Sequence, residues 1–494
     1  MRRGLAIALT ALVSGVLTGC GGGDPSGAAS EGASDGAELA VMSFNVWYGG
    51  GSVDAASIGR AIDAADADVV GLQEPEGNTR RIAQQAGMAF ADPSLHLISR
   101  YPIYPAERDG VRFGYVEVSP GEVVAVANTH LPSTPYGPYE VRDGASAEEV
   151  VGLERRTRLP EARPYARVLA ALAGEDVPVF LTGDMNSPSH LDSTEIEWPV
   201  SKAFADAGLR DSYREVHPDP LAVPAPTWTP GRPPPFKPDD ETSDRIDWVL
   251  AGGPAEALDS RLVGEPGGPD VEVEVDPWGS DHRAVASTFA TEPAPAPALV
   301  AAEPAVVERG DPVAVRYTLG DSGAGTSAAI VPARGAGKKP LVSLPLRTGH
   351  DHVAPNLGTA TVDPGSYRAA LLGGDGELIA TTPLWIEQPG AAPRVKTSRD
   401  AYAPGETITA SWTAAPGNKY DWVGIYPAGE PSVYAYEGFF YTAGRADGRL
   451  AIDRSELGRL APGDYEVRLV LDDGYAALAV DGFEVAASRS ASKR

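Results

Sequence analysis

Short apolar runs alternate with segments of helical periodicity between Leu39 and Thr291. This alternation constrains the fold more than any other feature, because mostly buried strands mixed with helices are typical of layered α/β domains. The segment therefore predicts an α/β domain over residues 39–291. The runs LAVMSFNVW, DVVGLQE, LHLIS, EVVAVANTHL, VPVFLTGD and RAVASTFA predict strands, and VDAASIGRAIDAAD, TRRIAQQAG, YARVLAALAG and WPVSKAFADAGL predict helices.

The stretch FLTGDMNSPSH, residues 180–190, ends one of these buried strands with two polar residues. Alternate residues of an extended chain point the same way, so Asp184 and Asn186 are expected to face one spot together. A carboxylate beside an amide is costly inside a core and useful in a site. We therefore expect this strand end to belong to a functional site.

Other predicted strands also carry polar residues, at their ends or within them, whose side chains could take part in catalysis or metal binding. Each of these residues has a plain structural alternative as a turn former, a helix cap or a solvated surface group. Polar groups from several strand ends that converge on one edge are, however, how layered α/β enzymes build their sites. The set consists of Asn45, Glu74, His130, Asp184, Asn186, Asp247, Asp281 and His282.

This ordered set resembles the endonuclease/exonuclease/phosphatase superfamily, over roughly residues 39–291. The resemblance implies a four-layer sandwich, in which two mixed β-sheets are flanked by helices, and metal-dependent hydrolysis of a phosphoester. It further implies that Glu74, with Asn45 and Asp281, binds Mg²⁺, with Mn²⁺ or Ca²⁺ as substitutes. These residues suit Mg²⁺, because this ion binds oxygen ligands and usually takes only one or two carboxylates from the protein.

The resemblance also suggests roles for the remaining residues of the set. Asp184 would hold or deprotonate the attacking water, with Asn186 supporting its geometry. His282 would face the phosphate, oriented by Asp247, and His130 would donate from the opposite side. Whether Asp184 or His282 is the general base stays open at this point.

Two further segments are candidates for substrate contacts. The loop after His130 and the loop after Asn186 supply Tyr136, Tyr139, Arg142 and His190, although His190 could equally hold a backbone group. A cluster of arginines follows, and it is either an anion clamp or a solvated helix with glutamate partners. Its members are Arg155, Arg156, Arg158, Arg163 and Arg167.

The formal charge of −27, from 68 acidic and 41 basic residues, disfavours binding to nucleic acid or to an anionic membrane surface. We therefore expect a phosphoesterase that acts on a small or lipid-linked phosphate ester, with a secreted nuclease for DNA or RNA as the alternative. A non-catalytic binding protein is a third hypothesis, which the retention of both His282 and Asp247 disfavours. We expect a monomer.

The first 38 residues predict a lipid anchor. Residues 1–19 have a basic start and an apolar run, as in a secretory signal, and LTGC resembles the bacterial lipoprotein box. This implies cleavage before Cys20, the chain's only cysteine, and lipidation of its sulfur, with an ordinary secretory signal as the alternative. Residues 20–38 then form a flexible tether. The expected location is the extracytoplasmic face of the cell membrane.

The last two hundred residues contain a repeat. VERGDPVAVRYT matches YAPGETITASWT, and VDPGSYRAALLGGDGELIA matches LAPGDYEVRLVLDDGYAAL. Short alternating strands with Gly/Pro turns predict two immunoglobulin-like β-sandwiches, at residues 300–388 and 392–487. Residues 292–299, rich in proline, are expected to be a linker. The sandwiches are expected to be spacers or adhesion modules without chemistry.

Overall fold

The computed structural model describes residues 37–487 except 52, 54, 193–194, 230–240, 321–324, 334–338, 347–355, 434, 454–456 and 475. The predicted signal, its lipidation residue Cys20 and nearly all of the predicted tether lie outside the described residues. The described residues from Ala37 on form one compact unit. No helix among the described residues is long and apolar enough to span a membrane.

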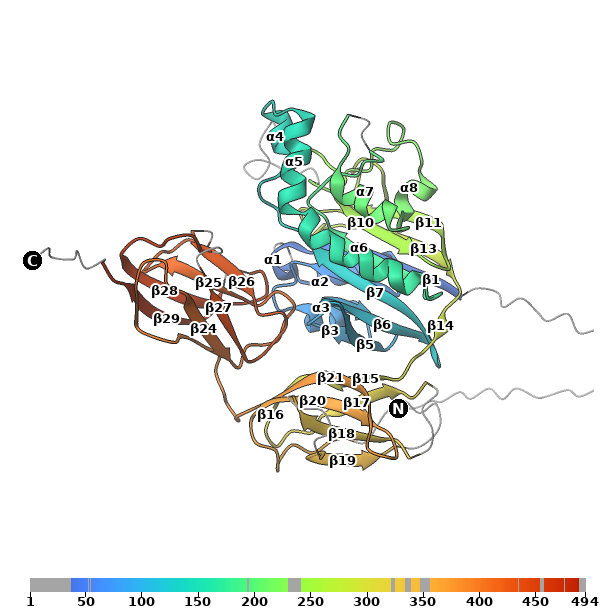
Figure 1. The fold of residues 1–494 in the computed structure, drawn as a ribbon. Coiled ribbons are helices and arrows are strands. Elements are labelled where there is room, and N and C mark those ends of the chain that lie inside the picture. Colours follow the sequence, from blue (N-terminus) through green and yellow to red (C-terminus); the bar gives the residue numbers. More distant parts are fainter. Residues whose placement is uncertain are drawn as a thin grey trace, which may run out of the picture. The chain divides into compact units, whose positions relative to one another are not determined.

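The α/β domain contains two mixed sheets built from β1 to β14, and Figure 1 labels several of these strands. In the first sheet β1 pairs in parallel with β2 and antiparallel with β13. The order is β12 (Val271–Glu274), β11 (Ala255–Gly264), β13 (Ala284–Thr291), β1 (Ala37–Asn45), β2 (Val69–Gln73), β4 (Leu97–Ser99) and β3 (Phe90–Asp92).

In the second sheet β8 pairs in parallel with β7 and antiparallel with β10. Its order is β5 (Ile103–Arg108), β6 (Val111–Ser119), β7 (Glu122–His130), β8 (Val179–Asp184), β10 (Asp247–Gly252) and β9 (Arg210–Asp211), and β14 (Ala294–Pro295) pairs with β7.

The helices of this domain are α1 (Trp47–Gly50), α2 (Ala55–Ala64), α3 (Thr79–Gln85), α4 (Gly137–Arg142), α5 (Ala147–Thr157), α6 (Leu159–Ala173), α7 (Pro199–Asp206) and α8 (Ser212–Val216). Strand alternation divides the core into layers. Val41 and Val69 pack with Val126 and Phe180 between the two sheets. The next residue on β1, Met42, packs outward with residues of α2 and α3.

The outer face of the second sheet is covered in the same way. Ala127 and Leu181 pack with Leu169 of α6 and Phe204 of α7. The predicted helices at 53–66, 79–87, 165–174 and 198–209 thus correspond to α2, α3, α6 and α7. The mixed sheets and their flanking helices form the four layers that the sequence predicts.

The segment predicted as a linker, residues 292–299, is instead part of the packed structure. Ala294 and Pro295 extend the second sheet by pairing with β7. Ala296 and Leu299 are buried against Tyr104. The proline-rich composition indicated a free linker, but the alanines and the leucine between the prolines are small or apolar enough to be buried.

The remaining described residues form two β-sandwiches, whose strands Figure 1 shows from β15 on. In the first, β15 (Leu299–Glu303) pairs with β17 (Ala314–Thr318), and the second sheet runs β16 (Val306–Glu308), β21 (Leu378–Glu387), β20 (Gly365–Leu372), β18 (Ser327–Pro332) and β19 (Val342–Pro345). Its core includes Val315, Ile330 and Leu384.

The second sandwich has the same plan. One sheet runs β22 (Arg394–Thr397), β24 (Ile408–Thr413) and β27 (Gly448–Ile452), and the other runs β23 (Ala401–Tyr402), β29 (Ala477–Val485), β28 (Gly463–Val470), β25 (Trp422–Pro427) and β26 (Gly438–Tyr441). Val423, Ile425 and Val467 are fully buried in its core. Each sandwich therefore has its own core.

Candidate active site

Three strands of the second sheet bring three predicted site residues to one edge. His130 ends β7 and lies opposite Asp184 in the parallel ladder with β8. Asp247 begins β10 and lies opposite Asp184 in the antiparallel ladder. Asp184 is therefore central, and its side chain is almost fully buried.

The first sheet meets this edge through Asn45, the last residue of β1. Its Nδ2 donates to Oδ2 of Asp184 at 3.1 Å and to Oε1 of Glu74 at 3.3 Å. Glu74 follows β2 with a φ of 54°. Left-handed backbone is uncommon for residues other than glycine and clusters at functional sites. The contact joins the predicted metal residues to the predicted catalytic carboxylate.

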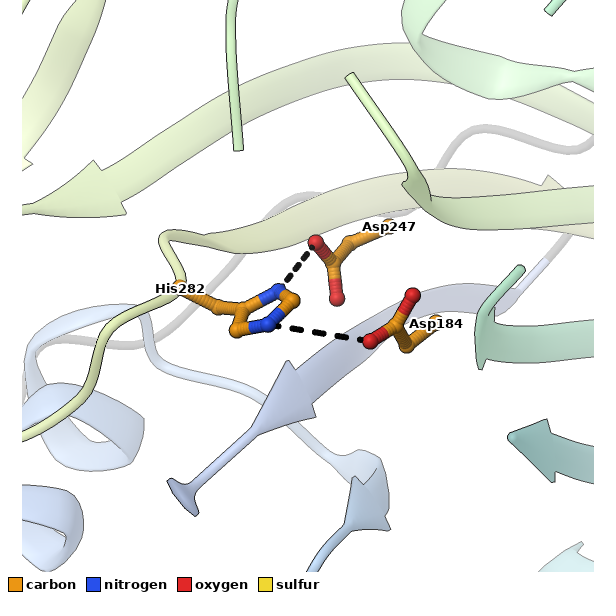
Figure 2. Close-up of side chains that lie close together, drawn as sticks. All are labelled: Asp184, Asp247 and His282. Carbon is orange, nitrogen blue, oxygen red and sulfur yellow. Dashed lines mark hydrogen bonds and ion pairs between the residues drawn. The ribbon is translucent and has the colours of Figure 1, made fainter. Parts of the chain in front are cut away.

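His282 lies between two aspartates, as Figure 2 shows. Its Nδ1 is 2.9 Å from Oδ2 of Asp247, and its Nε2 is 3.7 Å from Oδ2 of Asp184. The hydroxyl of Ser280 accepts a hydrogen bond from the His282 backbone N–H and donates to the carbonyl of Asn45. The imidazole is thus fixed from both sides of the ring and through its backbone.

The aspartates keep the two site histidines protonated. Burial lowers the pKa of His282, but Asp247 and Asp184 outweigh it and raise this pKa to about 10. Burial likewise opposes the charged form of His130, whereas hydrogen bonding to Asp473 and the charge of Asp184 raise its pKa to about 9. Both rings are therefore cations near neutral pH.

Asp184 shows the opposite balance. Burial, followed by repulsion from Asp247, raises the pKa of Asp184 despite the two nearby histidines. Its Oδ1 accepts a hydrogen bond from the backbone N–H of Asn186 at 2.9 Å. The Asn186 side chain donates to the carbonyl of Leu131 at 2.9 Å. Asn186 thus links Asp184 to the chain that follows β7.

His130 receives its second carboxylate from the second β-sandwich. Its Nε2 lies 3.6 Å from Oδ2 of Asp184, and its Nδ1 lies 3.3 Å from Oδ2 of Asp473. The backbone N–H of His130 also donates to the hydroxyl of Tyr420 at 3.0 Å. Both histidines therefore have a carboxylate at Nδ1 and Asp184 near Nε2.

A cavity of about 580 Å³ opens over these groups. The predicted residues that line it are Glu74, His130, Tyr136, Tyr139, Asp184, Asn186, Asp281 and His282. Asn45 and Asp247 are fully buried and contact the lining side chains from below. The structure thus brings the eight strand-end residues and two of the four substrate candidates together.

Arg142 and His190 do not line this cavity. The guanidinium of Arg142 stacks on Tyr139 at 4.5 Å and pairs with Asp143. His190 lines a separate pocket, where its backbone N–H and its Nδ1 both lie 2.8 Å from the hydroxyl of Ser201. Their positions depend on how the loops pack, which strand alternation does not determine.

One arginine of the cluster, Arg158, supports the cavity wall, and none of the five lines the cavity. Arg158 is fully buried and pairs with Glu154 at 2.6 Å. Its guanidinium donates to the carbonyls of Ser133 and Pro135 at 3.1 and 2.7 Å. This buried ion pair fixes the loop that carries Tyr136 into the cavity.

The donor groups of the site fit a divalent cation. Glu74 and Asp281 offer the carboxylate oxygens that Mg²⁺ prefers, whereas Oδ1 of Asn45 accepts the backbone N–H of Trp47 at 3.1 Å. The side chains of Asp184, Asp247 and His282 also come within 4.8 Å of one another through potential ligand atoms. Oδ1 of Asp247 is buried without a hydrogen-bond partner among the described residues. His282 is a weaker ligand because its raised pKa favours the protonated ring, whereas a metal ligand must be deprotonated.

The charges around the cavity agree with this fit. Five carboxylates and two histidines line it, and no lysine or arginine does so among the described residues. The excess of negative charge is what a divalent cation would neutralise. The carboxylates are those of Glu74, Glu161, Asp184, Asp281 and Asp473.

Sequence reasoning missed the contribution of the second sandwich. Asp473, Tyr420 and four further aromatic residues come from this sandwich, which was expected to be a spacer. A comparison of the two repeats contains a signal, because the second has KYDW where the first has AGTS; Asp473 itself gives none, because Asp375 occupies the matching position in the first repeat. Polar and aromatic residues confined to one repeat indicate a use that the shared fold does not require.

Residues 42–282 match the sequence model of the Endonuclease/Exonuclease/phosphatase family. An uncharacterized Caenorhabditis elegans protein, F14F9.5, is 29% identical over 255 residues, which cover 44% of this chain and 79% of that protein.

The chain also matches two solved structures at low TM-score. An endonuclease/exonuclease/phosphatase from Beutenbergia cavernae is 18% identical, with 70% of this chain and 99% of that chain covered and a TM-score of 0.33. A mannosyl-6-phosphatase from Bacteroides thetaiotaomicron is 16% identical, with 51% and 99% covered and a TM-score of 0.29. The matched residues, 42–282, contain every residue of the predicted catalytic and metal set, and over this range the chain is similar to the Endonuclease/Exonuclease/phosphatase family.

Proposed function

We propose that this protein is a cell-surface, divalent-metal-dependent phosphoesterase that hydrolyses a phosphate mono- or diester by attack of water. The proposal is supported by the family, which includes metal-dependent phosphatases and nucleases. The observation that carries it is the position of Asp184, which lies buried between His130 and His282 and contacts Asn45. In such a site the carboxylate can bind a water molecule, and the two cationic donors beside it can bind a phosphoryl group.

Asp184 is proposed as the group that holds and deprotonates the water. Its raised pKa makes its carboxylate a stronger base than an ordinary carboxylate. The backbone N–H of Asn186 keeps one oxygen in place, so that the other can face the cavity. A cation bound by Asn45, Glu74 and Asp281 would polarise a phosphoryl oxygen and neutralise negative charge.

His130 and His282 are proposed as donors to the phosphoryl oxygens or to the leaving group. A protonated imidazole with a carboxylate at Nδ1 can present only its Nε2–H to a ligand. In both residues Nε2 is the atom on the Asp184 side. Because their pKa values are raised well above neutrality, neither is suited to act as the general base.

The alternative function is an extracellular nuclease for DNA or RNA, which the family also permits. The charge of −27 and the lack of lysine and arginine among the described lining residues count against it. Binding of a polynucleotide depends on such cations. A small or lipid-linked phosphate ester is therefore the preferred substrate class.

We also propose that the chain acts as a monomer attached to the cell membrane through lipid on Cys20. The support is the sequence around this cysteine, which has the basic start, apolar run and LTGC box of a bacterial lipoprotein. Attachment at the extracytoplasmic face would give the enzyme access to lipid-linked esters.

An assay of the purified full chain tests the function. Phosphomonoesters, phosphodiesters, sphingomyelin and plasmid DNA are incubated with Mg²⁺, with wild type and Asp184→Asn run in parallel. Release of phosphate or alcohol by wild type alone supports the proposal. Cleavage of plasmid DNA with no turnover of the small esters would favour the nuclease. Equal turnover by wild type and variant would overturn the site assignment.

A further inference from the structure

One face of the second sandwich carries an unusual number of aromatic side chains. Val423 and Ile425 of β25 point into the sandwich core, so Trp422 and Tyr426 lie on the opposite, outward face. In the neighbouring ladder Trp422 pairs with Tyr441, and Gly424 pairs with Phe439. The outward face of β25 and β26 is therefore covered by aromatic rings rather than by polar residues.

These rings form part of the catalytic cavity. Trp422, Tyr436, Phe439 and Tyr441, here called the aromatic wall, line the same cavity as His130 and Asp184. Ring centroids are 5.1 Å apart for Tyr436 and Phe439 and 5.5 Å apart for Phe439 and Tyr441. Tyr436, Phe439 and Tyr441 are 39%, 41% and 38% exposed, so they present ring surface to the cavity.

Hydrogen bonds connect the aromatic wall to the catalytic residues. The hydroxyl of Tyr441 donates to Oδ1 of Asp473 at 3.0 Å, and Oδ2 of Asp473 faces His130. Tyr420, whose ring lies 4.9 Å from that of Tyr441, accepts the backbone N–H of His130. The wall is thus positioned through the same residues that hold His130.

The fold of the sandwich does not require this wall. In the first sandwich Ser327 pairs with Pro345 and Ala329 pairs with Ser343, at the ladder positions that Trp422, Tyr441, Gly424 and Phe439 occupy in the second. The same strands therefore form without aromatic residues at these positions. Exposed aromatic surface beside a site, absent from a structurally equivalent module, indicates ligand binding.

The chemistry of the wall restricts its ligand. Aromatic faces bind apolar and ring-shaped groups, and no lysine or arginine lines the cavity among the described residues to accept a second anionic group. The hydroxyl of Tyr441 is already engaged with Asp473. An uncharged group with an apolar ring face matches this surface better than a polyphosphate or an oligonucleotide.

We propose that the aromatic wall is a subsite for the leaving group of the ester, and that this group is uncharged with an apolar ring face. This proposal rests on the phosphoesterase function proposed above. The α/β domain would supply the groups that act on phosphorus, and the second sandwich would select the alcohol that leaves. The second sandwich is then a determinant of specificity.

Matched esters test the subsite in the full chain. The methyl and benzyl esters of the class that wild type hydrolyses are compared for wild type, Tyr436→Ala and Phe439→Ala. Because each ester is compared with itself, its intrinsic reactivity cancels. We expect each variant to lose about tenfold in kcat/KM for the benzyl ester, equivalent to roughly 1.4 kcal/mol, and less than about twofold for the methyl ester. Equal losses for both esters, or none, would overturn the proposal.

Leu341→Ala is the matched control. Leu341 is a 50% exposed apolar residue of the first sandwich, so its replacement removes similar exposed surface away from the cavity. It should leave the ratio of benzyl to methyl turnover unchanged. A change in that ratio would mean that loss of apolar surface anywhere affects turnover, and the subsite would lose its support.

A binding measurement separates this proposal from the proposed function. Calorimetry compares methylphosphonate with benzylphosphonate, which cannot be hydrolysed at the carbon–phosphorus bond. Tighter binding of benzylphosphonate that Phe439→Ala abolishes supports the subsite even if wild type hydrolyses no ester. Equal affinities would overturn it. If the variants instead lose binding to neutral phosphatidylcholine vesicles while benzylphosphonate binds unchanged, the wall is a membrane-contact surface and the proposal is wrong.

Discussion

Oδ2 of Asp473, in the turn between β28 and β29 of the second sandwich, lies 3.3 Å from Nδ1 of His130 at the end of β7. The same arrangement occurs at His282, whose Nδ1 lies 2.9 Å from Asp247 within the α/β domain. One histidine thus has a local carboxylate partner, and the other depends on a distant part of the chain. This relationship makes the second sandwich part of the active site.

Asp473→Asn should lower kcat about tenfold to a hundredfold, the range for carboxylates that orient a functional histidine. KM should change little, because the carboxamide of the variant has the shape of the Asp473 carboxylate and can still accept the hydrogen bond from Tyr441 of the aromatic wall. If Asp473 acts through His130, then His130→Gln and the double variant should have the same kcat. Additive losses would show that Asp473 acts independently of His130. Asp375→Asn, at the matching turn of the first sandwich, serves as the control and should retain wild-type kcat.

Asp472→Ala should release the second sandwich from the α/β domain. Oδ1 of Asp472 lies 2.6 Å from Nε2 of His96, with both side chains fully buried, and its Oδ2 accepts the N–H of Gly77. Removing one partner of such a buried hydrogen-bonded pair costs about 1–3 kcal/mol. Limited proteolysis should then cleave the segment between the sandwiches, near residues 388–393, faster than in wild type. Unchanged cleavage would mean that other contacts suffice to hold the sandwich.

Glu74→Ala should abolish hydrolysis and leave the melting temperature close to that of wild type. The carboxylate is half-buried at the cavity and contacts Asn45 rather than the core. Chelator should inactivate wild type in the same way, and added Mg²⁺ or Mn²⁺ should restore it. Calorimetric titration with Mn²⁺ should show loss of binding in the variant. Full activity in excess chelator would contradict the metal assignment.

The rate of wild type should fall as the pH rises through about 9 to 10, the raised pKa values of His130 and His282. The sign follows from their role, because a protonated donor is present below its pKa and is lost above it. Asp247→Asn removes the carboxylate that raises the pKa of His282, so the alkaline limb of kcat/KM should move to lower pH. Asp184→Asn should instead cause a severe loss, about a hundredfold or more, at every pH. Indistinguishable profiles for the two variants would refute this division of roles.

Cys20→Ser should move the protein from the membrane fraction to the medium or leave it unprocessed. The expectation follows from the lipoprotein box, since lipid on this sulfur would be the hydrophobic attachment. Metabolic labelling with a radioactive fatty acid should mark wild type and not the variant. A variant that is still processed and retained in the membrane fraction would contradict lipidation.

Much of the site could be predicted from local sequence. Strand alternation and the order of the strands are short-range properties, and they were enough to select Asn45, Glu74, His130, Asp184 and Asp247 as residues of one edge. The register of β7, β8 and β10 then places three of them side by side, because adjacent strand ends meet at the same edge of a sheet.

Loop residues were harder to predict. Tyr136 reaches the cavity because buried Arg158 holds the preceding carbonyls, whereas Arg142 turns onto Tyr139. Both outcomes depend on packing between α4, α5 and α6. Sequence periodicity carries no information on such contacts. Residue type and expected exposure alone therefore could not show that Tyr136 lines the cavity and Arg142 does not.

The sequence by itself determined the layered α/β domain, its strand-end polar residues and the two β-sandwich repeats, because each follows from periodicity, order or internal similarity. Only the tertiary structure decided that the second sandwich, and not the first, closes the cavity. That outcome rests on contacts between residues far apart in the chain, such as His96 with Asp472 and His130 with Asp473. Their energy comes from burial, from hydrogen bonding and, at His130, from charge pairing across an interface, which neither repeat contains alone.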